Sequence, residues 1–310
     1  MNTVNYIDVL GLGSVTVDFV GTIDKWPAEG AKQPLEGLSI HDGGLIGTAL
    51  VAVSRLGGCA AFAGKLGNSD MARRAVQAFR KDGVDTSLVS STSDAEPIVA
   101  FVFTSSLTGH RNIFWTRQGV QYPMPDELPD TRWYERTRVL LIDYECGQAG
   151  IAAAKIAKMH KIPVVSDIEG KTQHAAEAMA ISTHLIVSED FAQSYTNKTT
   201  LDGMLASLRT NQEQTVIVTC GDRGCVGLGP EGKFALSAYK INVIDTTGCG
   251  DTFHGAFALA IAKKKNVIEA AQFASAAAAM CATKIGGRDG IPNAEQLNIF
   301  MKNNNIIRSF

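Results

Sequence analysis

The chain has almost no excess of charge of either sign. Its 29 lysines and arginines face 31 aspartates and glutamates, a formal net charge of −2 over 310 residues. Proteins that bind nucleic acids usually concentrate basic residues on one face, and the basic run 263–265 is only as long as a solvated helix end. We therefore expect no nucleic-acid partner.

Long apolar runs are also missing. The first 13 residues have neither the basic start nor the long apolar segment of a signal peptide. The alanine-rich stretch 271–282 is interrupted by Gln272 and Ser275, and it is shorter than the roughly 20 apolar residues that cross a bilayer. We expect a cytoplasmic protein without a membrane partner.

Cysteine is sparse and scattered. The nearest pair, Cys220 and Cys225, has no second pair beside it, as a zinc site of four cysteines would need. Reduced and mostly buried thiols in a cytosolic protein are the simplest interpretation.

Two common nucleotide motifs are absent or incomplete. No P-loop pattern of the G-x-x-x-x-G-K-[ST] type occurs. "GLGSVT" follows an apolar run but lacks the third glycine of a dinucleotide fingerprint, and it leads into strand-like sequence. A P-loop enzyme is excluded, and a dehydrogenase is disfavoured.

What the sequence does contain is a repeated alternation of short apolar runs with longer segments of helical period. The runs are typical of strands covered on both faces: "IDVLGLG", "AAFAGKLG", "RVLLIDY", "IPVVSDI", "HLIVSE" and "TVIVTCG". Repeated strand–helix units predict a doubly wound, mostly parallel α/β sheet flanked by helices.

Residues 15–40 and 97–118 break this rhythm. Both read as short strands without helices, and "AFVFTSS" and "RNIFWTR" suit a hairpin turning at 107–110. With no linker or repeat in the sequence, we expect one domain over residues 1–310 with a small β-sheet lid built from these insertions.

Two glycine stretches carry the chemistry. In "HDGGLIGTALVAVSRLGG", Gly43 and Gly44 precede a helix rich in small residues, and paired glycines let a backbone approach a ligand closely. In "DTTGCGDTFHGAF" (245–257), the small residues Gly248, Cys249 and Gly250 open another helix. The free N–H groups and positive end of that helix suit a phosphoryl group.

Asp251 is in conflict with such an anion hole. A helix-capping acid needs no Gly-x-Gly before it, and a carboxylate repels the phosphate that the hole attracts. A general base that takes the proton of an incoming hydroxyl resolves the conflict, and such help accelerates a reaction by roughly 10²–10⁴. We therefore predict that Asp251 is a base beside a phosphoryl site.

At this point the sequence resembles a known family, the ribokinase-like (pfkB) carbohydrate kinases. "DTTGCGDTFHGAF" is similar to their C-terminal signature Asp-Thr-x-Gly-Ala-Gly-Asp, and "DGGLIGTALVAVSRLG" to their N-terminal one. "VTCGDRG" looks like their nucleotide-site stretch and "GLGSVTVD" like their first strand. The resemblance implies ATP- and Mg²⁺-dependent phosphorylation of a sugar, usually at a primary hydroxyl.

The resemblance also implies roles for individual residues. The sugar would be held by Asp18, Gly43, Gly44 and Glu145, and the nucleotide would lie along Thr219, Gly221 and Gly224. A monovalent cation such as K⁺ would bind at Asp245, Thr247 and the loop 281–290, which includes Lys284 and Gly286. The resemblance further implies a homodimer that forms through the lid, as in other members of the family.

Four departures from the family pattern bear on these roles. Thr16 and Thr48 stand where ribokinases carry asparagines that bind sugar hydroxyls, and a threonine offers one hydroxyl in place of a two-ended amide. The family's Asn-x-x-Glu appears as Ser188-Glu189-Asp190-Phe191, so Glu189 or Asp190 would reach Mg²⁺ through water. Cys249 replaces an alanine, and its thiol at a helix N-terminus is a candidate for a lowered pKa. His254 replaces an asparagine and would line the nucleotide site or pack inside.

The substrate is less constrained. We expect a ketohexose type, with sulfofructose as one candidate because the sequence looks closest to the sulfofructose kinase branch. In the lid, His110, Arg111 or Arg117 would meet the sulfonate. Another ketose, a keto-deoxy sugar acid or a nucleoside stays open. From different classes, a catalytically weak sugar- or nucleotide-binding regulator and a dehydrogenase are the alternatives.

Overall fold

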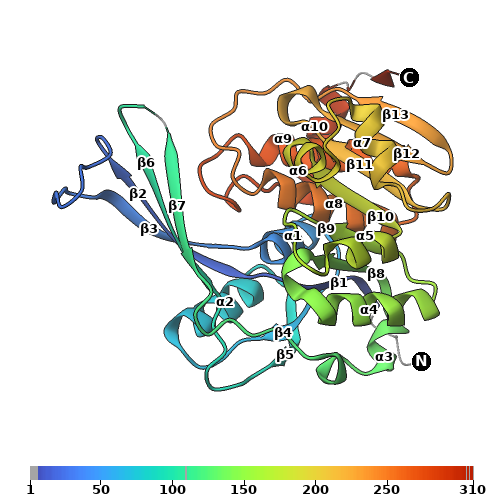
Figure 1. Cartoon of the computed structure of the whole chain (residues 1–310), viewed down its shortest axis with the longest axis horizontal. Coiled ribbons are helices and arrows are strands. Elements are labelled where there is room, and N and C mark those ends of the chain that lie inside the picture. Colours follow the sequence, from blue (N-terminus) through green and yellow to red (C-terminus); the bar gives the residue numbers. More distant parts are fainter. Residues whose placement is uncertain (1–5, 109, 305, 307, 310) are drawn as a thin grey trace.

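A computed structural model describes residues 6–108, 110–304, 306 and 308–309 of the chain. The described residues form a ten-stranded sheet with helices on both faces and a separate four-stranded sheet (Figure 1). In the large sheet the order is β14-β13-β12-β11-β10-β9-β8-β1-β4-β5. Its strands are β1 (Ile7–Leu12), β4 (Ala60–Lys65), β5 (Asp85–Ser90), β8 (Thr137–Asp143), β9 (Val164–Asp167), β10 (His184–Ser188), β11 (Thr215–Thr219), β12 (Cys225–Gly229), β13 (Gly232–Leu236) and β14 (Arg308–Ser309).

The large sheet is parallel from β5 to β11 and antiparallel at the β12–β14 edge. Successive strand residues point to opposite faces: Val139 and Leu141 join one core, while Leu140 and Ile142 join the other. The predicted doubly wound α/β architecture is confirmed. None of the described helices is long and apolar enough to cross a bilayer.

Two sets of helices cover the two faces. One set is α1 (Leu45–Arg55), α2 (Asp70–Lys81), α8 (Cys249–Ala262), α9 (Val267–Cys281) and α10 (Ala294–Asn303). The other is α3 (Thr131–Tyr134), α4 (Gly147–Met159), α5 (Ala175–Ile181), α6 (Glu189–Thr196) and α7 (Leu201–Leu208).

The small sheet projects from one side of the body (Figure 1). Its order is β3-β2-β6-β7; the strands are β2 (Thr16–Ile23), β3 (Glu36–Gly43), β6 (Ile98–Ser105) and β7 (Arg111–Thr116). β6 and β7 pair as the expected antiparallel hairpin, although Gly109 of its predicted turn lies outside the described residues. The predicted small-sheet lid is therefore present.

A topological switch point lies between β1 and β8. The chain leaves β1 toward β4 on one side, whereas β8, β9, β10 and β11 follow on the other. The Ser14 amide and hydroxyl, just past β1, donate to Asp143 Oδ2 at the end of β8, at 2.7 and 2.8 Å. Ligands of doubly wound sheets bind in the crevice at this point, outside the carboxyl ends of the strands.

Helices α1 and α8 approach so closely that their backbones touch. A Cβ built on Gly255 of α8 would lie 2.1 Å from the Ala49 carbonyl oxygen of α1. Glycine at 255 therefore sets how near the N-termini of these two helices come to each other above the sheet.

Replacing Gly255 by alanine should push α1 and α8 apart. Overpacking of this kind costs about 1–3 kcal/mol of unfolding free energy, which urea unfolding would report as a lower midpoint. Gly250→Ala in the same helix is the control, because a Cβ there meets nothing within 4 Å. Unchanged midpoints for Gly255→Ala would show that the helices are not in contact.

Candidate functional site

Helix α8 begins at the edge of the sheet with an open N-terminus. Its cap, Gly248, has φ of 73° and a built Cβ would lie 2.2 Å from the Gly287 oxygen, so only glycine fits. The Cys249 amide donates to Thr246 at 3.3 Å. The amides of Gly250 and Asp251 lie in the first turn, where no carbonyl of the preceding turn is available. Of the predicted hole, the Gly250 end is therefore the open part.

Asp251 lies in that first turn, half-buried and facing other acids. Burial, followed by the charge of Glu169 and the thiol of Cys281, raises the pKa of Asp251 well above its usual range. Burial also raises the pKa of Asp167, which lies at the end of β9. The Oδ1 atom of Asp167 has no hydrogen-bond partner among the described residues. Burial likewise raises the pKa of Asp143 to about 7.

Sequence reasoning missed Asp143, Asp167 and Glu169. The first two each end an apolar strand of the parallel sheet, "RVLLID" and "PVVSD". An acid closing such a strand was the available signal, because all carboxyl ends of parallel strands meet at one edge.

The predicted sugar side is assembled by the pairing of β2 with β3. Thr16 lies opposite Gly43, and Asp18 lies opposite His41. A Cβ on Gly43 would come within 2.6 Å of both Asp18 Oδ2 and Thr16 Oγ1. The Thr16 hydroxyl is buried and has no hydrogen-bond partner of good geometry among the described residues. Asp18, Thr16 and Gly43 thus lie together, as expected for a polyol site.

Gly44 is the next residue and caps α1. Its φ is 92°, and a Cβ built there would lie 2.6 Å from the Ser14 carbonyl oxygen. The glycine therefore lets the start of α1 lie against the loop that follows β1.

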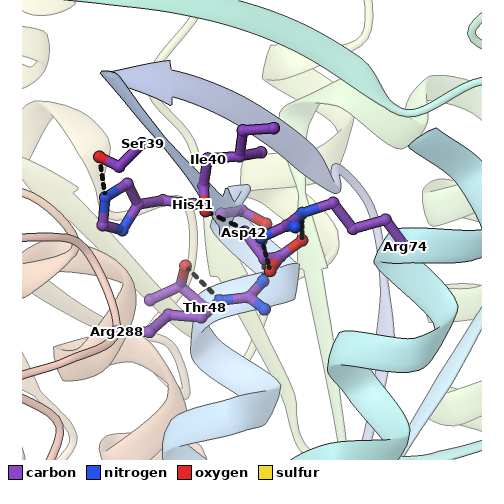
Figure 2. Close-up of polar contacts among 8 residues, drawn as sticks. Ser39, Ile40, His41, Asp42, Thr48, Arg74 and Arg288 are labelled. Atoms are coloured by element: carbon purple, nitrogen blue, oxygen red, sulfur yellow. Dashed lines mark hydrogen bonds and ion pairs between the residues drawn. The ribbon is translucent and has the colours of Figure 1, made fainter. Parts of the chain in front are cut away.

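Arg288 is the largest feature that sequence reasoning missed. It is only 7% exposed. Its Nη2 donates to the Gly43 carbonyl at 2.8 Å, and its Nε lies 3.4 Å from Thr48 Oγ1 (Figure 2). Gly47 leaves room for it, because a Cβ there would lie 2.7 Å from Nη2. Burial lowers the pKa of Arg288 to about 10, so it stays a cation at neutral pH.

The charge of Arg288 acts on both acids of the site. It lowers the pKa of Asp18 and of Asp251 against the larger effect of burial. The only sequence signal for this role of Arg288 was its place directly after Gly286-Gly287 in the predicted cation loop. Thr48 is buried against Arg288 and does not face an open site.

Two arginines of the lid contact the body. Arg117 stacks on Trp115, with 3.9 Å between its guanidinium carbon and the ring centre, and it forms a close ion pair with Glu145. Arg111 Nη1 donates to Thr247 Oγ1 at 2.7 Å. Glu145 and Arg111 therefore lie where lid and body meet, each already paired.

The expected cation loop is partly assembled. Asp245 accepts from the Thr247 amide and hydroxyl at 2.9 and 2.7 Å and from the Gly286 amide at 2.9 Å. Arg111 Nη1 lies 3.8 Å from Asp245 Oδ1. The side chain of Lys284 is exposed and does not join them.

The expected nucleotide residues lie at the same edge of the sheet. Ser188 and Thr219 are register partners at the ends of β10 and β11. Gly221 has φ of 59° with open space around its built Cβ, and Gly224 has φ of 95° with a built Cβ only 2.0 Å from the Leu236 oxygen. The backbone at both positions therefore favours glycine, and the two glycines flank Asp222 and Arg223 in this turn.

Ser188 and Glu189 are occupied within the chain. Ser188 Oγ caps α6 by accepting from the Phe191 amide at 3.2 Å. Glu189 forms a close ion pair with Arg223. A ligand would have to compete with both contacts.

Side-chain packing determines the surroundings of His254 and Cys249. His254 is 5% exposed, with its ring nitrogens 2.8 Å from the Gly250 oxygen and 3.2 Å from the Ile186 oxygen; of the two alternatives expected for it, it packs inside. The pKa of the Cys249 thiol is raised instead of lowered, because the thiol hydrogen-bonds to Cys281 and is largely buried.

The chain is similar to known proteins over nearly its whole length. A family model described as "pfkB family carbohydrate kinase" matches residues 7–294. Fructokinase-1 of Zea mays is 28% identical, covering 95% of this chain and 98% of the maize protein. A ribokinase of Haemophilus influenzae is 25% identical, covering 94% and 97%.

Solved structures share the fold. A protein of Agrobacterium tumefaciens described as a putative ribokinase superposes with a TM-score of 0.87 at 24% identity, covering 95% and 97% of the two chains. Arabidopsis thaliana ribokinase, solved with ribose and ATP, gives 0.86 at 23%, covering 95% and 98%. An Escherichia coli protein titled a putative ribokinase II, solved with ATP and Mg²⁺, gives 0.82 at 19%, covering 96% and 99%.

Proposed function

The chain belongs to the pfkB family of carbohydrate kinases, and from this premise we propose that it transfers the γ-phosphate of ATP to a hydroxyl, most simply a primary one, of a ketohexose or ketohexose derivative. One observation supports this proposal most strongly. The Asp251 carboxylate lies in the same helical turn as the open amides that begin α8, at the switch point of the sheet.

In the proposed mechanism, Asp18 and the Gly43–Gly44 turn hold the sugar, and Asp251 accepts the proton of the attacking hydroxyl. The sugar oxygen forms a bond to the γ-phosphorus as the bond to the β,γ-bridging oxygen breaks and ADP leaves. The amides at the start of α8 face the phosphoryl oxygens, where charge is stabilised most in a water-excluded site. A high pKa suits Asp251 to this task, since it strengthens the base.

Mg²⁺ fits the site only together with ATP. Among the residues that the structure describes, no three acids, histidines or cysteines are grouped to hold a metal on their own. Mg²⁺ typically takes one or two carboxylates, water and substrate phosphates. Glu169 and the unpartnered Asp167 Oδ1 offer such carboxylates near Asp251, whereas the sequence-based candidate Glu189 is paired with Arg223. Mg²⁺ would neutralise phosphate charge during the transfer.

Potassium fits less well. The Asp245 carboxylate accepts from two amides and a hydroxyl and lies beside Arg111, so its charge is already countered. Activation by K⁺ stays a prediction from the family resemblance, and the cytoplasmic location stays a prediction from the sequence.

The ketohexose assignment rests on two supports. Fructokinases are among the curated relatives, and the amides that ribokinases use on ribose are threonines here, one of them covered by Arg288. A sulfonated ketohexose is the second candidate, favoured by the gathering of Arg111, Arg117 and Arg288 around the site. Residues 188–191 depart from the family's Asn-x-x-Glu pattern. Because of this departure, a regulator that binds sugar or nucleotide without catalysis is the alternative from a different functional class.

A homodimer through the lid is proposed from the outer face of the small sheet. That face carries exposed apolar side chains on the side away from Asp18: Leu38, Ile40, Phe101 and Phe114 at 59%, 39%, 40% and 56%. Exposed patches of this kind mark interaction sites.

Sedimentation velocity tests the dimer. Phe114→Asp should yield monomers at concentrations where the unaltered chain is dimeric, because a charge at the centre of an apolar interface is not solvated. Met159→Asp, an equally drastic change at an exposed apolar residue of α4, should leave the dimer intact. A monomeric unaltered chain would refute the interface.

Asp251→Asn tests the proposed base. The variant should still bind ATP and sugar in calorimetry, while kcat should fall by about 10²-fold or more, because the amide cannot accept the hydroxyl proton. Asp202→Asn, which alters an exposed acid in the first turn of α7, is the matched control and should turn over normally. Wild-type turnover by Asp251→Asn would eliminate the base.

Arg288→Met tests the electrostatics of the same site. Asp251 must be ionised to act, and Arg288 lowers its pKa against the opposing effects of burial, Glu169, Cys281 and Asp143. Loss of the cation should therefore raise that pKa and move the acidic limb of the kcat–pH profile to higher pH, by about one unit. Arg288→Lys should leave the limb near its original position. Coinciding limbs for the Met variant and the unaltered enzyme would contradict the account.

A further inference from the structure

A second hollow lies beside the sugar site without belonging to it. Its volume is about 430 Å³, within the usual range of ligand pockets. It opens along the outer edge of β3, between that strand, α2, the end of α1 and residues 288–289. Asp18, Gly44, Glu145 and Asp251 are not among its lining residues.

Four cationic side chains from three separate segments line this hollow: Arg55 of α1, Arg74 and Lys81 of α2, and Arg288. Three aspartates also line it, Asp42, Asp82 and Asp289, so the formal lining charge is +4 −3 = +1. Charges converging from elements distant in sequence are a more specific arrangement than a run of like charges on one helix.

Two of the three aspartates, Asp42 and Asp82, are paired with arginines of the hollow, whereas the cations keep N–H donors that no described residue accepts from. Both oxygens of Asp42 accept from Arg74, one from Nε and the other from Nη2, at 3.0 Å each (Figure 2). Asp82 accepts from Arg55 Nε at 2.7 Å. Arg74 Nη1, Arg55 Nη2 and Arg288 Nη1 donate to no described residue. The Lys81 ammonium has no acceptor in the described part of the chain either.

We propose that this hollow is a binding site for a small phosphate monoester, separate from the catalytic site. The remaining donors are guanidinium and ammonium groups, which make charge-assisted hydrogen bonds to phosphate oxygens. The site is a candidate for regulation of the kinase by a phosphorylated metabolite.

Arg288 connects the two sites, and this part of the inference rests on the proposed function. The same guanidinium lines the hollow and holds the Gly43 carbonyl at 2.8 Å. Arg74 fixes the end of β3 through Asp42 and the Ile40 carbonyl, the latter at 2.8 Å (Figure 2). An anion bound to Arg74 and Arg288 steadies the β3–α1 turn that carries the sugar contacts. Its binding therefore raises the affinity for the sugar, and by linkage the sugar raises the affinity for the anion.

Calorimetry with glycerol phosphate and, in a second arm, inorganic phosphate tests the site directly. The full chain is first saturated with a non-hydrolysable ATP analogue and Mg²⁺, which fills the phosphoryl site at α8. Saturable binding of glycerol phosphate should remain, and Lys81→Glu should weaken it about tenfold or more. Arg80→Glu on the same helix is the control, since Arg80 contacts Thr86 outside the hollow. Tighter binding of inorganic phosphate than of the monoester would assign the site to free phosphate and overturn the ligand class.

The same variants test the coupling. Glycerol phosphate should lower the KM for the sugar in the unaltered enzyme and in Arg80→Glu, but not in Lys81→Glu, whose kcat without effector should be unchanged. Binding is measured without turnover, so it can succeed or fail independently of the proposed activity. No saturable binding beside the ATP analogue, or equal binding by Lys81→Glu, would overturn the site; binding without a KM change would overturn its regulatory role.

Discussion

The site depends on backbone-to-backbone contacts that only glycine permits. Gly255 brings α8 against the Ala49 carbonyl of α1, and Gly248 brings the start of α8 against the Gly287 carbonyl. These contacts place the N-termini of α1 and α8 and the 286–288 loop around one space above the sheet switch point. The open amides at the start of α8 and the buried Arg288 then converge where phosphate transfer requires a fixed positive potential.

Electrostatics gives this space its chemical character. Asp143, Asp167, Glu169 and Asp251 lie together with raised pKa values, which burial causes in each case. Such a cluster destabilises the fold at neutral pH unless cations neutralise it, a cost that active sites commonly carry. Arg288 is the resident counter-charge, and ATP-bound Mg²⁺ would add the second. The small sheet is tied to the body beside this space through Arg111 and Arg117.

Features written in local sequence were predictable, and features that depend on distant packing were not. The alternation of apolar runs predicted the α/β fold, and Gly-Cys-Gly before an apolar helix predicted the open end of α8. No pattern in the neighbouring sequence predicts that Arg288 fills the space beside Gly47 and contacts Thr48. The position of His254 stayed open between two alternatives for the same reason: its partner Ile186 lies on β10, and only the fold brings the two residues together. The thiol of Cys249 hydrogen-bonds to the thiol of Cys281 on α9, so the pKa of Cys249 is raised and not lowered as expected.

The central claim is that this chain phosphorylates a ketohexose with ATP. The most direct measurement is ADP formation by the purified protein from Mg·ATP, with and without K⁺, across fructose, sulfofructose, other ketoses, ribose, keto-deoxy sugar acids and nucleosides. The account predicts the highest kcat/KM for a ketohexose or its sulfonated derivative. A preference for ribose or a nucleoside would contradict the substrate assignment, and no ADP with any sugar, although ATP binds, would contradict the proposed activity in favour of a binding role.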